Sequence, residues 1–329
     1  MDISDQINSW KGKRVLLIGE TLIDRYIFGN ADSISPDAPV PNVKISESKI
    51  YLGAIGLVLQ YVRSLGGKPE ICTIIGNDYE GDFFKNELKT LGISTQNILI
   101  DENINTPQIT RIKAMGQHLL RLETDYSSEF SPNSVTNFLN IIENLQESYD
   151  SIIILDYGAG ELFQDVFIQE LLNLLKNKFK NVPIIARPDT INYYLYENID
   201  LIKINLQKAL NQFSIDCCND TSVSIVGKRI LNSTRCNNLF LNYLETDSYL
   251  FTKNKERMET FEPLLKEPVR SFVAAGSAIM AVLGLTYAAK IPVSLGIEIA
   301  LHAAVLSAIS PPVNFFSMEK LKAFIKSNK

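Results

Sequence analysis

The sequence is poor in the residues on which redox and metal chemistry depend. It has 4 cysteines and 2 histidines among 329 residues, and no two cysteines have the CxxC spacing of zinc and thiol redox motifs. The histidines, His118 and His302, are far apart along the chain. This pattern argues against a disulfide framework and against a zinc site, so we expect no metal centre and reduced thiols.

Long apolar runs and an excess of positive charge are also missing. The most apolar stretch, residues 274–289, is rich in alanine and glycine and is followed by Lys290 and Pro292, so it is too short for a membrane span. A formal net charge of −5 argues against nucleic-acid binding. The first residues are polar and acidic, unlike a secretory signal. We therefore expect a cytoplasmic protein that binds neither membranes nor nucleic acids.

Short apolar strands alternate with helical segments along most of the chain. Hydrophobic residues make up 46% of the sequence, enough for a sizeable core. Strands are predicted at Arg14–Gly19, Glu70–Gly76, Ser151–Leu155, Pro183–Ala186, Leu201–Ile204 and Asn238–Leu241. Helices are predicted at Ala54–Leu65, Gly81–Leu91, Phe163–Lys178, Leu206–Asn211, Ser222–Asn232, Gly276–Ala289 and Val293–Ile309. This alternation predicts an α/β sandwich of three layers, with a mostly parallel sheet between two layers of helices.

Two segments interrupt the alternation. Tyr26–Ser48 and Gln108–Glu123 contain stretches in which apolar and polar residues alternate, as in β-strands with one exposed face. We expect antiparallel strands outside the main sheet, forming a small lid inserted at about 26–48 and 108–123 of a single domain, 1–329. Such a lid would expose an apolar face and unpaired edges. We therefore expect a homodimer through the lid strands or a hetero-oligomer with an active homologue.

The lid segment resembles a known family. Residues 19–26, GETLIDRY, and 34–41, ISPDAPVP, resemble the opening of bacterial D-glycero-D-manno-heptose-7-phosphate kinases, which are ribokinase/PfkB-family enzymes. Further matches occur in the same order as in the family, at Ile109–Arg111, Gln117–Leu122, Asp156–Gly158 and Asn205. The resemblance covers nearly the whole chain. It implies a ribokinase-like fold and a role in heptose or surface-carbohydrate metabolism. The nucleotidyltransferase domain that some relatives carry after the kinase is not found within these residues.

The resemblance also implies where the catalytic base should be. In the family a Gly-Ala-Gly-Asp motif at a helix start forms an anion hole and supplies the base; here the matching residues are Ala274–Ser277. Gly276 is retained, but Ser277 occupies the position of the aspartate. A serine hydroxyl is not ionised near neutral pH, and loss of a general base typically costs about 10²–10⁴ in rate. Ala274 adds a Cβ where the family has glycine, which should crowd the anion hole.

The positions that bind nucleotide and metal in the family are changed as well. Its NxxE motif is Asn205 to Lys208 here, and a lysine cannot ligate magnesium. The family's Asp-Pro-Lys is Arg187–Asp189, and the lysine of its DYGKG motif is Ala159. The nucleotide loop ends in Asp247 instead of glycine, which would repel phosphate. We therefore expect weak ATP or ADP binding at most, and no magnesium.

Some substrate-binding features are retained. Asp24 matches the family aspartate that bonds sugar hydroxyls, and Gly53 and Arg111 match further substrate positions. A purely structural alternative is that Asp24 caps a strand end or pairs with Arg25. The retained residues predict contact with a sugar phosphate.

Two basic residues stand at predicted strand ends, where this fold class binds phosphate. Arg187 and Lys208, with Asn205 and Gly276, predict an anion pocket that works without magnesium. The alternative is that the two cations face solvent or pair with nearby Asp189 or Asp247.

Three functional hypotheses follow. The leading one is a catalytically impaired sugar-kinase homologue that acts as a sugar-phosphate-binding or regulatory subunit. The second is an active carbohydrate kinase with a displaced base, for example Asp24 or Asp189. The third is an enzyme of different chemistry in the same pocket.

Overall fold

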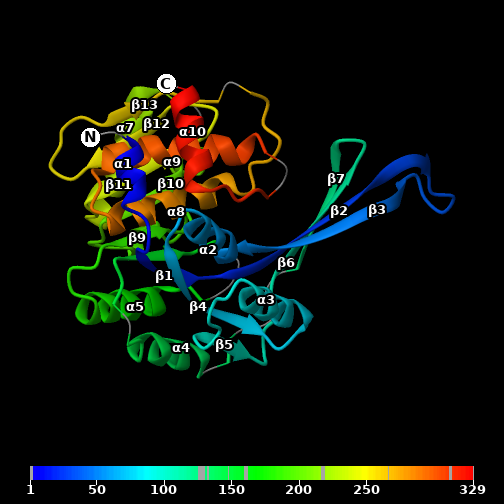
Figure 1. The fold of residues 1–329 in the computed structure, drawn as a ribbon, viewed down its shortest axis with the longest axis horizontal. Helices are drawn as coiled ribbons and strands as arrows, with labels where there is room; N and C mark the ends of the chain where they lie inside the picture. The colour runs from blue at the N-terminus through cyan, green and yellow to red at the C-terminus, as the bar shows by residue number, and fades with distance from the viewer. Residues whose placement is uncertain are drawn as a thin grey trace.

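The computed structural model describes residues 3–124, 130–131, 133–146, 148–158, 162–215, 219–265, 267–310 and 313–328. Its body is a nine-stranded sheet with helices on both faces (Figure 1), with the strand order β13-β12-β11-β10-β9-β8-β1-β4-β5. The strands are β1 (Arg14–Gly19), β4 (Lys68–Gly76), β5 (Ile98–Asp101), β8 (Ser151–Leu155), β9 (Ile184–Arg187), β10 (Leu201–Asn205), β11 (Asn238–Asn242), β12 (Ser248–Thr252) and β13 (Glu259–Phe261). Neighbours from β5 to β11 are parallel, and β12 and β13 are antiparallel additions at one edge.

The helices divide between two cores, one on each face of this sheet. They are α1 (Ile3–Asn8), α2 (Ile55–Ser64), α3 (Tyr79–Thr90), α4 (Ser134–Glu143), α5 (Asp165–Lys178), α6 (Leu206–Gln212), α7 (Asp220–Thr234), α8 (Ala275–Ala288), α9 (Val293–Ala308) and α10 (Met318–Ser327). One core contains residues of α1, α2, α3, α8, α9 and α10, and the other residues of α4, α5, α6 and α7. The predicted three-layer α/β sandwich is confirmed.

Small residues hold α8 close to the sheet, which matters because its first turn belongs to the candidate site. A Cβ at Gly284 would come within 2.4 Å of Ile153 Cδ1 in β8, and one at Gly296 within 2.2 Å of Thr286 Cγ2. Larger side chains at these glycines would push α8 away from β8 or from α9. The alanine and glycine content of the segment therefore reflects close packing. Within the described part of the chain, no helix is long and apolar enough to span a bilayer.

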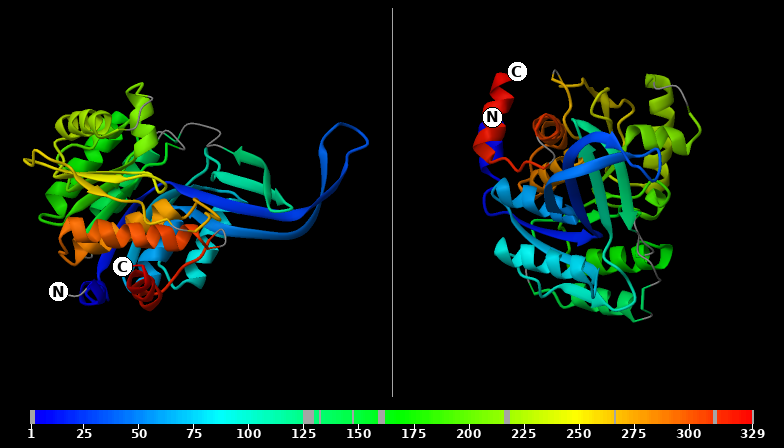
Figure 2. Two further views of the ribbon diagram at one scale, coloured as in Figure 1. Left: turned by 90° about the horizontal axis from the view of Figure 1, so that it is seen from above. Right: turned by 90° about the vertical axis from the view of Figure 1, so that its right-hand side faces the viewer.

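A second sheet forms the lid, with the order β3-β2-β6-β7. Its strands are β2 (Thr21–Ile34), β3 (Pro41–Ala54), β6 (Gln108–Ala114) and β7 (Gln117–Thr124). They extend from the body as an arm (Figure 2). The predicted lid is confirmed at both places in the chain, although β2 and β3 are longer than expected and reach back to β1 and α2.

The lid has the expected antiparallel pairs and, in addition, one parallel pair. β2 pairs with β3 and β6 with β7 in antiparallel fashion, but β2 and β6 are parallel, with Ile23 opposite Gln108 and Gly29 opposite Ala114. Both strands leave the body at its edge and run outward, so they lie side by side in the same direction. Two hairpins are thus joined by one parallel pair.

Candidate functional site

A pocket of about 240 Å³ lies where the carboxyl ends of β9, β10 and β11 face the start of α8. Arg187 ends β9, Asn205 ends β10 and Asn242 ends β11, and all three line the pocket. The carboxyl edge of parallel strands is the common ligand site of open α/β sheets, because loops and helix N-termini converge there. All the residues predicted for the anion site and the base line this pocket. They are Arg187, Asn205, Lys208 and Gly276 for the anion site and Ser277 for the base.

Ser277 lies in the first turn of α8 and is only 5% exposed. The residue before the helix, Ala274, provides no side-chain cap. The first backbone N–H groups of a helix have no partner within the helix, and the helix dipole adds positive potential there. This end of α8 is therefore suited to an anion.

Two residues expected to spoil the pocket do not line it. Ala274 is 2% exposed, has an ordinary φ of −95° and packs in the core with α8. Its Cβ therefore does not crowd the anion hole. Asp247 is likewise absent from the described lining, to which the nucleotide-loop segment contributes Asn242, Tyr243 and Leu244. The expected repulsion from Asp247 thus finds no support in the geometry.

Lys203 is a pocket residue that the sequence reasoning missed. It lies within β10, is only 5% exposed, and points its Nζ toward α8, where a Cβ on Gly276 would be 4.0 Å away. Among the described residues, its ammonium has no hydrogen-bond or ion-pair partner. Burial, with the charges of Arg187 and Lys208, lowers the pKa of Lys203 to about 7. A lysine inside an apolar strand run was the available signal, since buried lysines are rare.

Arg187 and Lys208 complete a group of three cations, which we call the cation triad. The Arg187 guanidinium stacks on the Tyr157 ring, 3.9 Å from its Cζ to the ring centroid, and its Nη1 donates to the Asp156 carbonyl at 3.3 Å. Neither Arg187 nor Lys208 forms an ion pair within the described part of the chain. The alternative in which they pair with Asp189 or Asp247 is therefore not what the structure has.

The two asparagines of the pocket have different roles. Asn205 Oδ1 accepts a hydrogen bond from the backbone N–H of Lys208 at 3.0 Å and so caps α6. Its carboxamide oxygen is engaged in structure, as in other helix N-caps. Asn242 is 5% exposed, and its Oδ1 is buried with no partner in the described residues. Buried polar atoms are nearly always paired, so this one indicates a ligand or water contact.

These residues do not fit a magnesium ion. Asp189 is the one carboxylate in the described lining of the pocket, beside three cations. Magnesium takes oxygen ligands in octahedral geometry, and neighbouring ammonium groups repel it. No cluster of three or more His, Cys, Asp or Glu side chains suited to a metal occurs in the described ranges.

The predicted sugar-binding residues form a second group. Asp24 is 1% exposed and forms an ion pair with Arg111 through Oδ1 and Nη1. Burial raises the pKa of Asp24, and Arg111 opposes that shift. A Cβ on Gly53 would lie 2.8 Å from Asp24 Oδ2, so only glycine leaves this side of the carboxylate open. The alternative partner, Arg25, instead contacts Ser48 Oγ at 3.5 Å.

Tyr157 belongs to the pocket, beside the cation triad. It lines the pocket together with Ser277, and its ring carries the Arg187 guanidinium. Burial raises the pKa of Tyr157, the Arg187 charge opposes this, and the carboxylates of Asp24 and Glu20 raise it further. Ala159, the changed lysine of the Asp156–Gly158 motif, lies outside the described residues.

Comparison with known proteins identifies relatives over most of the chain. The family model described as pfkB family carbohydrate kinase matches residues 13–314. The bifunctional protein HldE of Campylobacter curvus is 29% identical over 317 residues, which are 94% of this chain and 65% of that protein. The protein of the same name from Helicobacter pylori is 29% identical over 277 residues, 83% of this chain and 58% of its own length. The chain thus spans about three fifths of the length of the curated relatives it matches.

Solved structures share the fold at low sequence identity. Phosphofructokinase-2 from Escherichia coli superposes with a TM-score of 0.78 at 13% identity, covering 96% of this chain and 99% of that one. Ribokinase from Arabidopsis thaliana gives a TM-score of 0.74 at 12% identity, with the same coverage. The fold is therefore ribokinase-like, with a large, mostly parallel sheet and a small lid sheet.

Proposed function

Because the chain belongs to the pfkB family of carbohydrate kinases, we propose that it is a member that binds a sugar phosphate without phosphorylating it. Its role would be that of a binding or regulatory subunit in heptose or surface-carbohydrate metabolism. The heptose class follows from the resemblance of residues 19–26 and 34–41 to heptose-7-phosphate kinases. The relatives named bifunctional protein HldE agree with this placement.

The observation that most supports this proposal is the setting of Ser277. A carbohydrate kinase needs a carboxylate base and a magnesium ion where the phosphoryl group is transferred. Here Ser277 lines the same pocket as Lys203 and Lys208. A hydroxyl at the position of the base, with ammonium groups in the pocket, favours binding an anion over transferring one.

One observation favours an active kinase as a second candidate. Asp189 lines the pocket and has no ion pair within the described residues, so its carboxylate could act as a displaced base. Asp24 is a weaker candidate for this role because Arg111 engages it.

An assay of ATP-dependent phosphorylation separates the two candidates. Purified protein is incubated with magnesium, ATP and either heptose 7-phosphate or hexose phosphates, and sugar product is measured by mass spectrometry. We expect no product. Turnover above about 1 s⁻¹, the low end of kinase rates, would establish the active kinase instead. Loss of that turnover in Asp189→Asn would then identify the displaced base.

We further propose that the lid associates with a second copy of the chain or with an active homologue. Ile45 in β3 is 66% exposed, and Leu120 and Leu122 in β7 are 50% and 49% exposed. β3 and β7 are the two edges of the lid sheet, so their outer backbone groups have no neighbouring strand within it. Exposed apolar side chains on open edges favour a partner strand or sheet.

A further inference from the structure

The cation triad gives the pocket a charge that calls for an anionic ligand. Arg187, Lys203 and Lys208 face a single carboxylate, Asp189, so the described lining has a formal net charge of +2. The charge of Lys203 destabilises the fold most, because its side chain is 5% exposed and has no partner in the described part of the chain. A buried unpaired cation is strongly unfavourable unless a ligand compensates it.

A second, independent feature indicates a ligand in the same place. The buried Asn242 Oδ1 has no partner among the described residues, and Asn242 lines the pocket opposite the start of α8. A hydroxyl group on a bound molecule can donate to this oxygen. The ligand therefore has both an anionic group, for the triad and the helix N-terminus, and hydroxyl groups.

We infer that the cation triad holds the phosphate monoester of a phosphorylated sugar without a metal ion, with a sugar hydroxyl hydrogen-bonded to Asn242 Oδ1. This inference rests on the proposed function and specifies its ligand. A kinase binds a phosphoryl group while it is transferred from the nucleotide to the sugar. This protein instead binds a phosphate that is already esterified to the sugar. It thus binds the product of a carbohydrate kinase reaction.

Charge matching favours a monoester over a nucleotide. A phosphate monoester carries a charge of about −1.5 to −2 at neutral pH, which matches the formal +2 that the lining has when Lys203 is protonated. ATP carries more negative charge, which kinases offset with magnesium, and magnesium does not fit among the triad. Arg187 has a planar fork that suits phosphate oxygens, and the lysines act as point charges.

Asn242 indicates where the sugar part of the ligand lies. Its buried Oδ1 belongs to the same pocket as the triad, so a sugar hydroxyl that donates to it lies beside the bound phosphate.

Isothermal titration calorimetry in EDTA tests the inference. The probes are inorganic phosphate, glucose 1-phosphate, glucose and ATP. We expect phosphate and glucose 1-phosphate to bind, the ester more tightly, and added magnesium to leave both affinities unchanged. Lys203→Met and Lys208→Met should each weaken binding by about tenfold or more, the loss expected for one charged donor.

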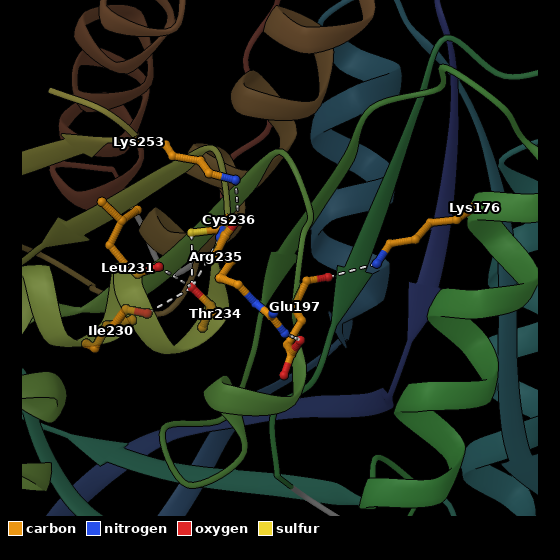
Figure 3. A network of polar contacts seen from close by, with 8 residues as sticks. All are labelled: Lys176, Glu197, Ile230, Leu231, Thr234, Arg235, Cys236 and Lys253. Carbon is orange, nitrogen blue, oxygen red and sulfur yellow. Dashed lines mark hydrogen bonds and ion pairs between the residues drawn. The ribbon is translucent and has the colours of Figure 1, made fainter.

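Lys176→Met is the matched control. Lys176 is also a partly shielded lysine whose pKa burial lowers, and its Nζ donates to the Glu197 carbonyl at 2.8 Å. It belongs to a separate network with Glu197 and Arg235 (Figure 3) and does not line the pocket. Its removal should leave phosphate binding unchanged.

Three outcomes would overturn the inference: no binding of either phosphate probe, binding that requires magnesium, or equal affinities in Lys203→Met and Lys176→Met. If Lys203→Met does not fold, Lys208→Met decides, because Lys208 is exposed on α6. The kinase assay is read separately. Turnover overturns the proposed function, whereas absent turnover with glucose 1-phosphate bound equally by wild type, Lys203→Met and Lys208→Met overturns this inference alone.

Discussion

The ammonium group of Lys203 faces Gly276 in the first turn of α8, with its Nζ 4.0 Å from where a Cβ on that glycine would stand. Both a lysine and a helix N-terminus carry positive potential, so in the absence of an anion they repel each other. The arrangement lowers the stability of the free protein and raises its affinity for an anion. The contact between Lys203 and the start of α8 therefore destabilises the free protein and favours anion binding.

Replacing Lys203 by methionine should stabilise the ligand-free protein at pH 7 by about 1–4 kcal/mol, as when other buried charges are replaced by apolar residues. The folded-state pKa of Lys203 is about 7, below the ordinary value of 10.5. The unfolded state therefore binds more protons between these values, and the free energy of unfolding rises with pH from about 7 to about 10.5. Urea unfolding at several pH values measures this slope, which should shrink in Lys203→Met. A slope in Lys203→Met equal to that of the wild type would contradict this prediction.

Ser277→Asp should not by itself restore phosphoryl transfer. The new carboxylate would lie in a pocket with Lys203 and Arg187, which would hold it as an ion pair and make it a weak base. Magnesium would still be opposed by Lys208, and members of a catalytic unit do not act independently. The single variant is assayed beside Ser277→Asp/Lys203→Met/Lys208→Glu. Kinase-like turnover in the single variant would mean that only the base had been lost.

Asp24→Asn should destabilise the fold by about 3 kcal/mol, because it leaves Arg111 as a buried charge without its carboxylate. Arg111 is 8% exposed, so water cannot replace the lost partner easily. The double variant Asp24→Asn/Arg111→Met should recover much of this loss. Thermal unfolding of the three proteins measures the coupling, and equal midpoints for wild type and Asp24→Asn would show that the pair contributes nothing.

The exposed lid should make the protein self-associate or bind a homologue. Sedimentation velocity at micromolar concentration is expected to show a dimer, and Leu120→Glu, at a side chain 50% exposed on β7, should shift it toward monomer. Val166→Glu is the control, since Val166 is 68% exposed on α5, outside the lid. A monomer in wild type that stays monomeric with an active homologue would rule out the lid as an interface.

Periodicity alone was enough for the order and type of most elements. The six predicted strands and seven predicted helices are all present, since buried parallel strands and helices with an apolar face have distinct patterns. It was not enough for β5, β12 and β13, which have only three to five residues, or for the helices α1, α4 and α10. The parallel pairing of β2 with β6 could not be predicted from the sequence pattern either, because it depends on where both strands leave the body.

The sequence determined which residue types stand at the family's positions, including Ser277, Lys208, Asp24 and Arg111. Only the tertiary structure decided which of them meet. It brought Lys203 from inside an apolar strand to the end of α8, and it kept Ala274 and Asp247 out of the pocket lining. The reason is geometric: strand ends, a helix start and their loops converge at one sheet edge. Which atoms face each other there depends on contacts between segments far apart in the chain.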